Sequence, residues 1–139
     1  MRKFWGFYDN GQYKVGCNGS SMYLYDAQNH ELARFKDLRD AYRGAFQPQS
    51  NLFVLRSTAG WLAVYDCEER KLLHKFRFSD ISASQDDGFC FSSDGSLFIN
   101  IERFGSSTQT RLSFYETQGF SSVKCWHTIQ TRKSQVCQY

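Results

Sequence analysis

Short alternating runs of apolar and polar residues cover most of the chain, and each run ends at turn-forming residues. Two stretches show the pattern best: "SNLFVLRSTAGWLAVYD" (50–66) and "GSLFINIERFGSSTQTRLSFYE" (95–116). Each begins with a turn, continues as an alternating strand, crosses a loop and ends on a tyrosine followed by an acid. An alternation with a period of two predicts half-buried β-strands, and Asn-Gly or Asp-Gly turns favour hairpins because they tolerate positive φ. The pattern predicts an all-β protein.

The tyrosine–acid pairs reveal an internal repeat. They lie at Tyr25-Asp26, Tyr65-Asp66 and Tyr115-Glu116, which are 40 and then 50 residues apart. An aromatic residue, a turn and an alternating strand precede each pair, and a more polar strand follows it. Each copy therefore predicts four short strands, and the fourth has the charged side chains that blunt an exposed sheet edge. We expect one repeat domain over residues 1–139, with units at approximately 3–38, 40–78 and 86–130 and a tail at 131–139.

One segment fits a helix as well as a strand. Residues 31–46, "ELARFKDLRDAYRGAF", place Leu32, Phe35, Leu38 and Tyr42 at helical intervals, but they also alternate. Periodicity alone does not separate the two over so short a run. The equivalent segments of the other copies are poor helices, so the repeat favours strands.

Four-stranded units that recur every 40 to 50 residues are typical of propeller blades. The turn and second strand in "FSSDGSLFINI" and "FQPQSNLFVLR", and the strand ends "LYD", "VYD" and "FYE", resemble WD-repeat β-propellers over about residues 3–130. The resemblance implies three four-stranded antiparallel propeller blades. No Gly-His dipeptide precedes the first strands and no Trp-Asp pair ends the third strands. The hydrogen-bonded tetrad of well-formed WD repeats is therefore assigned to no residue here.

Three blades do not close a ring, because propellers close with about four to eight. Two chains could complete a six-bladed ring as a homodimer, or the chain could be a fragment of a longer propeller. A third alternative is a compact barrel or sandwich that keeps the repeat only in its sequence. Met1 precedes a first strand closely and Ile129 ends a fourth, so whole blades are present and self-association is favoured.

Composition argues against several classes of partner. The net charge is +3 with 22% charged residues, and basic residues are interleaved with acids, so neither nucleic acid nor a membrane surface is expected as a partner. No apolar run approaches the roughly 20 residues of a membrane helix, and the start of the chain lacks the apolar core of a signal peptide. Five scattered cysteines suit free thiols in the reducing cytoplasm better than a disulfide framework.

Candidate chemistry is sparse. The three histidines (His30, His74 and His127) fall in or beside the fourth strands, with no nucleophile at a triad spacing. Cys125 and His127 share a strand face, but two ligands do not make a zinc site. The acids after the repeated tyrosines are expected to cap the next turn, and Asp86-Asp87 also suits a turn. No catalytic, cofactor-binding or metal-ligating residue is assigned, and no cofactor is expected.

These observations favour a non-catalytic, self-assembling scaffold that binds an unidentified protein through its loops. The third copy is lengthened at residues 104–110, which makes that loop the first place to look for a partner. A small regulatory protein that caps one partner fits the same pattern. The alternative is a propeller-type enzyme or small-ligand binder with a site on the central axis, although Gly6, Gly44 and Gly88 favour a narrow axis. The expected contact residues are Trp5, Tyr42, Phe104, Ser106, Ser107 and Thr108.

Overall fold

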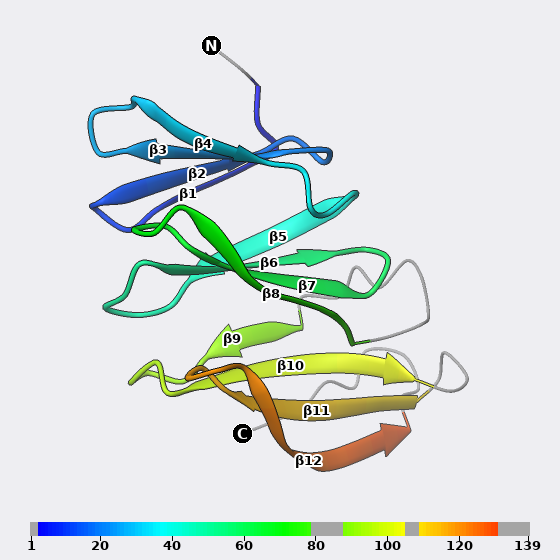
Figure 1. Cartoon of the computed structure of the whole chain (residues 1–139). Coiled ribbons are helices and arrows are strands. Elements are labelled where there is room, and N and C mark those ends of the chain that lie inside the picture. Colours follow the sequence, from blue (N-terminus) through cyan, green and yellow to red (C-terminus); the bar gives the residue numbers. More distant parts are fainter. Residues whose placement is uncertain (1–2, 79–87, 105–108, 131–139) are drawn as a thin grey trace.

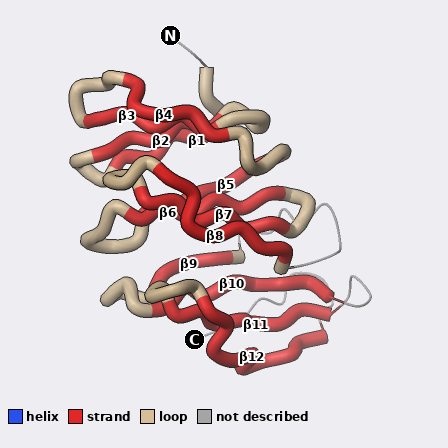
Figure 2. Tube along the Cα trace, in the orientation of Figure 1, coloured by secondary structure: helices blue, strands red, loops and turns tan. Residues whose placement is uncertain are grey.

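The computed structural model describes residues 3–78, 88–104 and 109–130 of the chain. These residues form twelve β-strands and no helix (Figure 2). The strands are β1 (Gly6–Asp9), β2 (Tyr13–Cys17), β3 (Met22–Asp26), β4 (Glu31–Phe35), β5 (Ala41–Phe46), β6 (Leu52–Ser57), β7 (Trp61–Asp66), β8 (Lys71–Arg77), β9 (Phe89–Phe91), β10 (Leu97–Phe104), β11 (Gln109–Glu116) and β12 (Ser121–Gln130). The all-β prediction is confirmed.

Each four consecutive strands form one antiparallel sheet, and the three sheets are stacked one after another along the chain (Figure 1). Sheet 1 contains β1–β4, sheet 2 contains β5–β8 and sheet 3 contains β9–β12. Sheets 1 and 2 approach each other most closely along their first strands, β1 and β5. The ambiguous segment 31–46 forms β4 and β5, so the strand interpretation is confirmed.

The strand registers explain the repeated tyrosines. Tyr25, Tyr65 and Tyr115 lie opposite Lys14, Phe53 and Phe98, which occupy equivalent places in the second strands. Tyr65 and Tyr115 are buried against the preceding sheet, whereas Tyr25 belongs to the first sheet and remains half-buried. The Tyr65 hydroxyl donates to Asp37 Oδ2 at 3.1 Å, so its polar end is satisfied within the interface.

The hydrophobic core consists of two layers, one between each pair of neighbouring sheets. Aliphatic side chains of sheet 1 meet aromatic side chains of sheet 2 in the first layer, while the second layer is mostly aromatic. The first layer includes Val15, Cys17, Met22, Leu24, Phe53, Leu55 and Tyr65. The second includes Val54, Leu62, Val64, Phe78, Phe89, Phe98, Tyr115 and Phe120.

Two of the three acids after the tyrosines, Asp26 and Asp66, cap turns as expected, whereas the same role for Glu116 stays a prediction. Asp26 Oδ1 accepts from the backbone N–H groups of Gln28 and His30, both at 2.9 Å. Asp66 Oδ1 accepts from the Glu69 N–H at 3.0 Å. Each of these two aspartates therefore fixes the hairpin that joins the third and fourth strands of its sheet.

Candidate functional site

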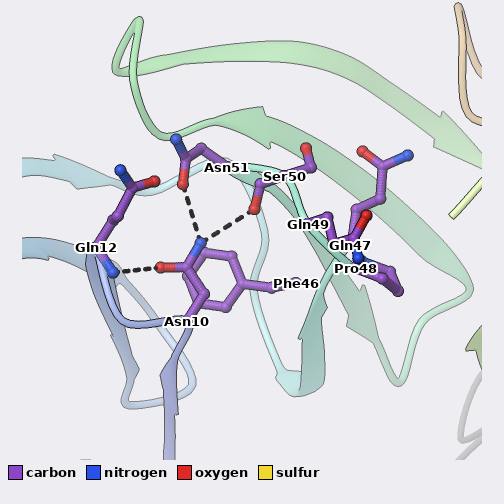
Figure 3. Close-up of a pocket in the computed structure, with 8 residues that line it drawn as sticks. All are labelled: Asn10, Gln12, Phe46, Gln47, Pro48, Gln49, Ser50 and Asn51. Atoms are coloured by element: carbon purple, nitrogen blue, oxygen red, sulfur yellow. Dashed lines mark hydrogen bonds between the residues drawn. The ribbon is translucent and has the colours of Figure 1, made fainter. Parts of the chain in front are cut away.

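A groove of about 500 Å³ lies between the turn that joins β1 to β2 and the turn that joins β5 to β6. These turns, residues 10–12 and 47–51, stand at the same end of sheets 1 and 2 (Figure 3). The groove is therefore placed at the ends of the two first strands. Its lining residues are Asn10, Gln12, Phe46, Gln47, Pro48, Gln49, Ser50 and Asn51.

Asn10 shapes the first turn and also joins it to the second. Its Oδ1 accepts from the N–H groups of Gln12 at 3.0 Å and Tyr13 at 2.8 Å, which closes the hairpin. Its Nδ2 donates to the Ser50 carbonyl and to Asn51 Oδ1, both at 3.0 Å (Figure 3). One side chain thus fixes its own turn and holds the neighbouring sheet beside it.

The second turn is fixed from its other side by sheet 3. Gln47 Nε2 donates to the Gly95 carbonyl, in the turn between β9 and β10, at 2.6 Å. Within the turn, Ser50 Oγ accepts from the Leu52 N–H at 3.1 Å. Gln49 has a backbone φ of 56°, in the left-handed region that residues other than glycine adopt uncommonly and mostly in turns. The corresponding turns of all three sheets are therefore linked in a row.

The lining of the groove is polar but uncharged. Five of its eight residues carry carboxamides, and none is ionisable. Phe46 and Pro48 add apolar surface, and the Phe46 ring packs edge-on against Phe53 with centroids 4.9 Å apart. The side chains of Gln12 and Gln49 make no hydrogen bond to the rest of the described chain, so their donors and acceptors are available to a ligand.

A second hollow, of about 430 Å³, lies at the opposite end of the sheets. Charged residues of both signs line it: Lys36, Asp37, Arg39, Asp40 and Lys75. Trp61 borders it with Lys75 Nζ at 5.0 Å and the Arg77 guanidinium carbon at 5.8 Å from its ring centroid. The linings of the two hollows therefore differ clearly in charge.

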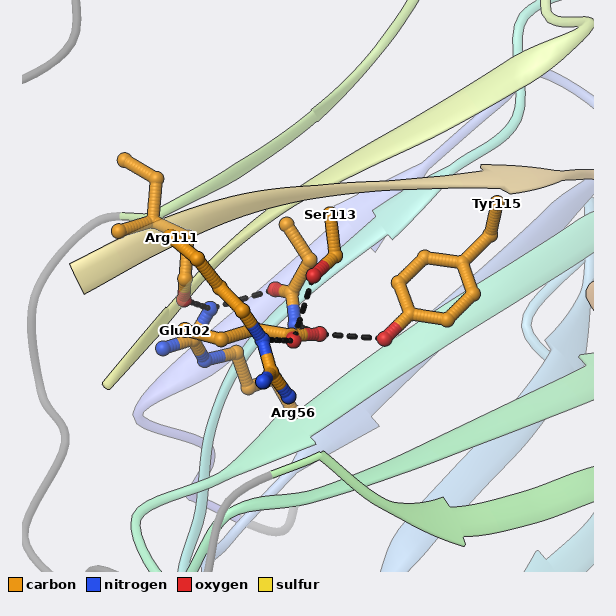
Figure 4. A network of polar contacts seen from close by, with 7 residues as sticks. Arg56, Glu102, Arg111, Ser113 and Tyr115 are labelled. Atoms are coloured by element: carbon orange, nitrogen blue, oxygen red, sulfur yellow. Dashed lines mark hydrogen bonds and ion pairs between the residues drawn. The ribbon is translucent and has the colours of Figure 1, made fainter. Parts of the chain in front are cut away.

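Glu102 is the centre of a polar network buried within the interface between sheets 2 and 3 (Figure 4). Its Oε1 accepts from Ser113 Oγ at 2.6 Å and from Arg111 Nε at 2.9 Å. Its Oε2 accepts from Asn100 Nδ2 at 3.0 Å and from the Tyr115 hydroxyl. Burial, reinforced by the neighbouring Glu102 charge, raises the pKa of Tyr115. The carboxylate thus accepts from donors on two strands of sheet 3.

Arg56 extends this network across the interface. It is fully buried in β6, and its Nη1 donates to Asn100 Oδ1 at 2.6 Å, to the Ile101 carbonyl at 3.0 Å and to the Gly88 carbonyl at 3.2 Å. Its guanidinium carbon lies 4.4 Å from the Phe78 ring centroid. Asn100 therefore links an arginine of sheet 2 to a carboxylate of sheet 3. Since Glu102 already accepts four hydrogen bonds, the network holds the sheets together and leaves no free acceptor for proton transfer.

Of the predicted contact residues, the structure describes Trp5, Tyr42 and the backbone of Phe104, and none of these lines the groove. Trp5, just before β1, is 47% exposed, and Tyr42 is half-buried in β5 with the Arg56 guanidinium carbon 5.9 Å from its ring centroid. Phe104 ends β10. Ser106, Ser107 and Thr108 lie outside the described residues, as does most of the lengthened loop. Their role as a contact segment remains a prediction.

The histidines and acids weighed for chemistry form no metal centre in the described part of the chain, where no group of three or more potential ligands occurs. His30 is exposed, and its Nδ1 lies 3.0 Å from Asp26 Oδ2. The Asp86-Asp87 pair and the side chains of Cys125 and His127 lie outside the described residues.

Sequence reasoning missed the residues that build both features. Arg56 and Glu102 were visible as charges inside otherwise apolar strands, which is the usual sign of a buried polar contact. Asn10, Gln47 and Asn51 were visible only as turn residues. Nothing local indicates that two turns about 40 residues apart meet.

No family model and no curated protein matches the chain. Solved structures do resemble it. They include hydrazine synthase from Kuenenia stuttgartiensis (TM-score 0.67, 16% identity, 87% of this chain and 35% of that chain). A second is the dihydro-heme d1 dehydrogenase NirN in complex with DHE (TM-score 0.67, 17% identity, 90% of this chain and 26% of that chain). A third is apo AztD from Citrobacter koseri (TM-score 0.63, 13% identity, 84% of this chain and 31% of that chain).

These neighbours are propeller-like proteins. The chain has a β-propeller-like fold. It spans about a quarter to a third of the length of the structures it matches. These structures do not test the WD-repeat type, the number of blades or the closure of the ring, which all stay predictions.

The comparisons contradict the prediction of a non-catalytic scaffold. Two of the three neighbours are named as enzymes, and the third is named in an apo form. The prediction that the chain is not an enzyme is contradicted by the same two structures. That prediction took the absence of a local motif as evidence, although the residues of a site can lie on separate loops of a rigid scaffold and share no local motif.

Other predictions are only partly tested. None of the described residues forms a helix of the length and apolar character that a membrane crossing requires. Cys17, Cys67 and Cys90 are free thiols, the first two buried and the third exposed. The cytoplasmic location, the protein partner and the homodimer stay predictions.

Proposed function

We propose that this chain supplies a ligand-holding part of a propeller-type enzyme or small-ligand-binding protein, and that the ligand occupies the amide-lined groove beside the central axis. The observation that carries the proposal is the groove itself. It lies at the ends of β1 and β5, and in propellers the blades are arranged around a central channel. Small-molecule sites are concave, and a few well-placed polar groups in them fix the orientation of the ligand.

Two further observations support this function. The turns that form the groove are fixed by hydrogen bonds from Asn10 and Gln47, so the site is organised before a ligand arrives. Preorganisation of this kind reduces the entropic cost of binding. Among the propeller-like neighbours, one is an enzyme solved in complex with DHE.

Fragment screening by NMR tests the proposal. A library of small uncharged polar fragments is added to the ¹⁵N-labelled chain, and the backbone amides of residues 10–12, 47 and 49–51 are followed. We expect hits to shift these amides and to leave Ala59 and Lys75, at the opposite hollow, unchanged. The variant Gln12→Trp should abolish the shifts by filling the groove, whereas Gln28→Trp, on an exposed turn of the same sheet, should not. Hits confined to other surfaces would contradict the proposal.

We further propose that the three sheets are propeller blades and that a second copy of the chain completes the ring. The outer face of sheet 1 supports this, because Phe7 alternates along β1 with Tyr8, which packs on Phe53 of sheet 2, and is itself 53% exposed. Tyr25 is half-buried on this face, whereas its equivalents Tyr65 and Tyr115 are buried against a neighbouring sheet. The face therefore has the character of a blade surface without its neighbour.

Light scattering of the purified chain tests self-association. A mass of two chains, reduced to one by Phe7→Lys, supports ring closure by a second copy. A mass of one chain contradicts it and favours blades supplied by a longer polypeptide. Gln118→Lys, the same added charge at an exposed residue on the turn before β12, serves as the control.

A further inference from the structure

We infer that the ligand of the amide-lined groove is a neutral saccharide. This inference rests on the proposed function, since it names the class of molecule that the same groove would hold. Three properties of the lining carry it: the absence of charge, the number of carboxamides and the presence of apolar surface beside them.

The absence of charge excludes ionic ligands first. Charged residues make up 22% of the chain, yet none of the eight lining residues is ionisable. Asp9 precedes the first turn, but its Oδ1 accepts from the Gly11 N–H at 2.8 Å and so serves the turn. Moving an ionic group out of water into a site without a countercharge is costly. A carboxylate, phosphate or ammonium ligand would therefore have no counter-ion in the groove.

The carboxamides match hydroxyl groups. A hydroxyl donates one hydrogen bond and accepts others, and a carboxamide does both through its two ends. Gln12 and Gln49 have both ends free among the described residues, and Asn51 uses only its Oδ1, as acceptor for Asn10. A ligand with several neighbouring hydroxyls satisfies such a set in many orientations, and a purely apolar ligand leaves it unsatisfied.

The apolar surface matches the other side of a sugar ring. Phe46 and Pro48 line the groove between the polar side chains, and Phe46 is half-buried and supported by Phe53. A pyranose has hydroxyls around its edge and C–H groups on its faces, so it combines both kinds of surface within one ring. An extended peptide also donates and accepts, but it is recognised along a free strand edge, which a groove between two turns does not offer.

A titration followed by NMR tests the saccharide class. Maltose, cellobiose and lactose are compared with glucuronate and glucosamine, which carry a negative and a positive charge, and with N-acetylglycinamide as a peptide mimic. We expect at least one neutral disaccharide to shift the amides of residues 10–12, 47 and 49–51. The charged sugars should bind about tenfold more weakly or not at all.

Two variants in the groove and one control outside it sharpen the test without disturbing the fold. Gln49→Gly removes one free carboxamide, and glycine readily adopts the φ of 56° found at this position. The variant should bind the disaccharide about tenfold more weakly. Gln12→Glu places a charge in the groove, while Gln28→Glu makes the same change on an exposed turn outside it and should leave binding unchanged. Equal effects of the two glutamates would contradict the inference.

The outcomes separate this inference from the proposed function. If uncharged fragments bind in the groove but none of the disaccharides does, the saccharide class is wrong and the ligand site stands. Preferential binding of N-acetylglycinamide or of a charged sugar also overturns the saccharide class. If no fragment and no sugar shifts the groove amides, both proposals fail.

Discussion

The ring of Phe53 lies directly against Gly44 on the neighbouring strand. A Cβ atom added to Gly44 would sit 2.3 Å from the ring Cζ and 3.1 Å from the Val54 carbonyl oxygen. The Gly44 N–H also donates to the Tyr8 hydroxyl at 3.0 Å, and the Tyr8 ring packs against Phe53 at a centroid distance of 5.4 Å. The glycine thus allows sheets 1 and 2 to meet along their first strands.

Replacing this glycine should destabilise the chain. Gly44→Ala forces the buried Phe53 ring to move within a packed interface, and overpacking of this kind costs about 1–3 kcal/mol. We expect the urea midpoint to fall accordingly, with an unchanged slope of the transition. Gly6→Ala is the matched control in β1, because a Cβ there meets mainly the end of the Tyr8 side chain, at 3.0 Å. Equal stability of the two variants would show that Phe53 is not held against Gly44.

The buried carboxylate of Glu102 should matter more for stability than any exposed acid. Glu102→Gln keeps the shape of the side chain but removes the charge opposite Arg111 and turns an acceptor into a donor that faces other donors. The loss of a satisfied buried acceptor costs about 1–3 kcal/mol. Urea unfolding should show this loss.

Glu116→Gln provides the control for this change, since it is the same substitution at an exposed position of sheet 3. Its effect should stay within about 0.5 kcal/mol, as for most surface changes. A second check is the Tyr115→Phe variant, which removes one donor to Glu102. The double variant is then compared with the two single ones. If the losses of unfolding free energy in Tyr115→Phe and Glu102→Gln add exactly in the double variant, the two groups do not interact as the structure shows.

Much of the architecture could be predicted from the sequence, because it is encoded locally. Period-two alternation identified the strands, and the tyrosine–acid pairs placed the third strand of each sheet. Tyr65 and Tyr115 recur because each fills the interface with the preceding sheet, and Asp26 and Asp66 recur because each caps a turn. A constraint that every repeat meets in the same way, in its own turn or against the sheet before it, leaves a readable mark in the copies.

The candidate site could not be predicted in the same way, because it arises between repeats. Asn10 contacts Ser50 and Asn51 across about 40 residues, and Gln47 reaches Gly95 across 48. The three turns differ in sequence, since each contacts a different neighbour. Features shared by the three copies therefore predict the fold, but they carry no information on the turn residues at which the copies differ.

The cysteines should differ sharply in reactivity. Burial raises the pKa of both Cys17 and Cys67 to about 12, so at pH 8 almost none of either is the thiolate that reacts with alkylating agents. Cys90 is exposed on β9. In a Cys125→Ser/Cys137→Ser background, mass spectrometry after iodoacetamide treatment should find Cys90 modified first. All three should react once urea unfolds the chain, and rapid native labelling of Cys17 would contradict its burial in the first core layer.

The turn before β10 should retain its negative charge in acid. Asp94 Oδ1 accepts from the Ser96 N–H at 2.9 Å and from the hydroxyls of Ser92 and Ser96, each at 2.8 Å. The backbone hydrogen bond from Ser96, followed by these hydroxyl groups, lowers the pKa of Asp94 from 3.8 to about 2. A lowered folded-state pKa means that the ionised cap stabilises the turn at pH values above 3.8, and that this contribution is lost as the pH falls through 3.8 towards 2.

An NMR titration from pH 6 to pH 3 measures this effect directly. At pH 3 an aspartate with a pKa of 3.8 would be mostly protonated, whereas Asp94 should remain mostly ionised and leave the Ser96 amide shift nearly constant. Asp94→Asn keeps an acceptor oxygen but does not titrate, so it gives the baseline for changes that arise elsewhere. If the Ser96 amide of the native chain moves with a midpoint near 3.8 while that of Asp94→Asn does not, the carboxylate does not hold the turn. Since Gln47 donates to the Gly95 carbonyl in this same turn, loss of the cap should also loosen the second turn of the amide-lined groove.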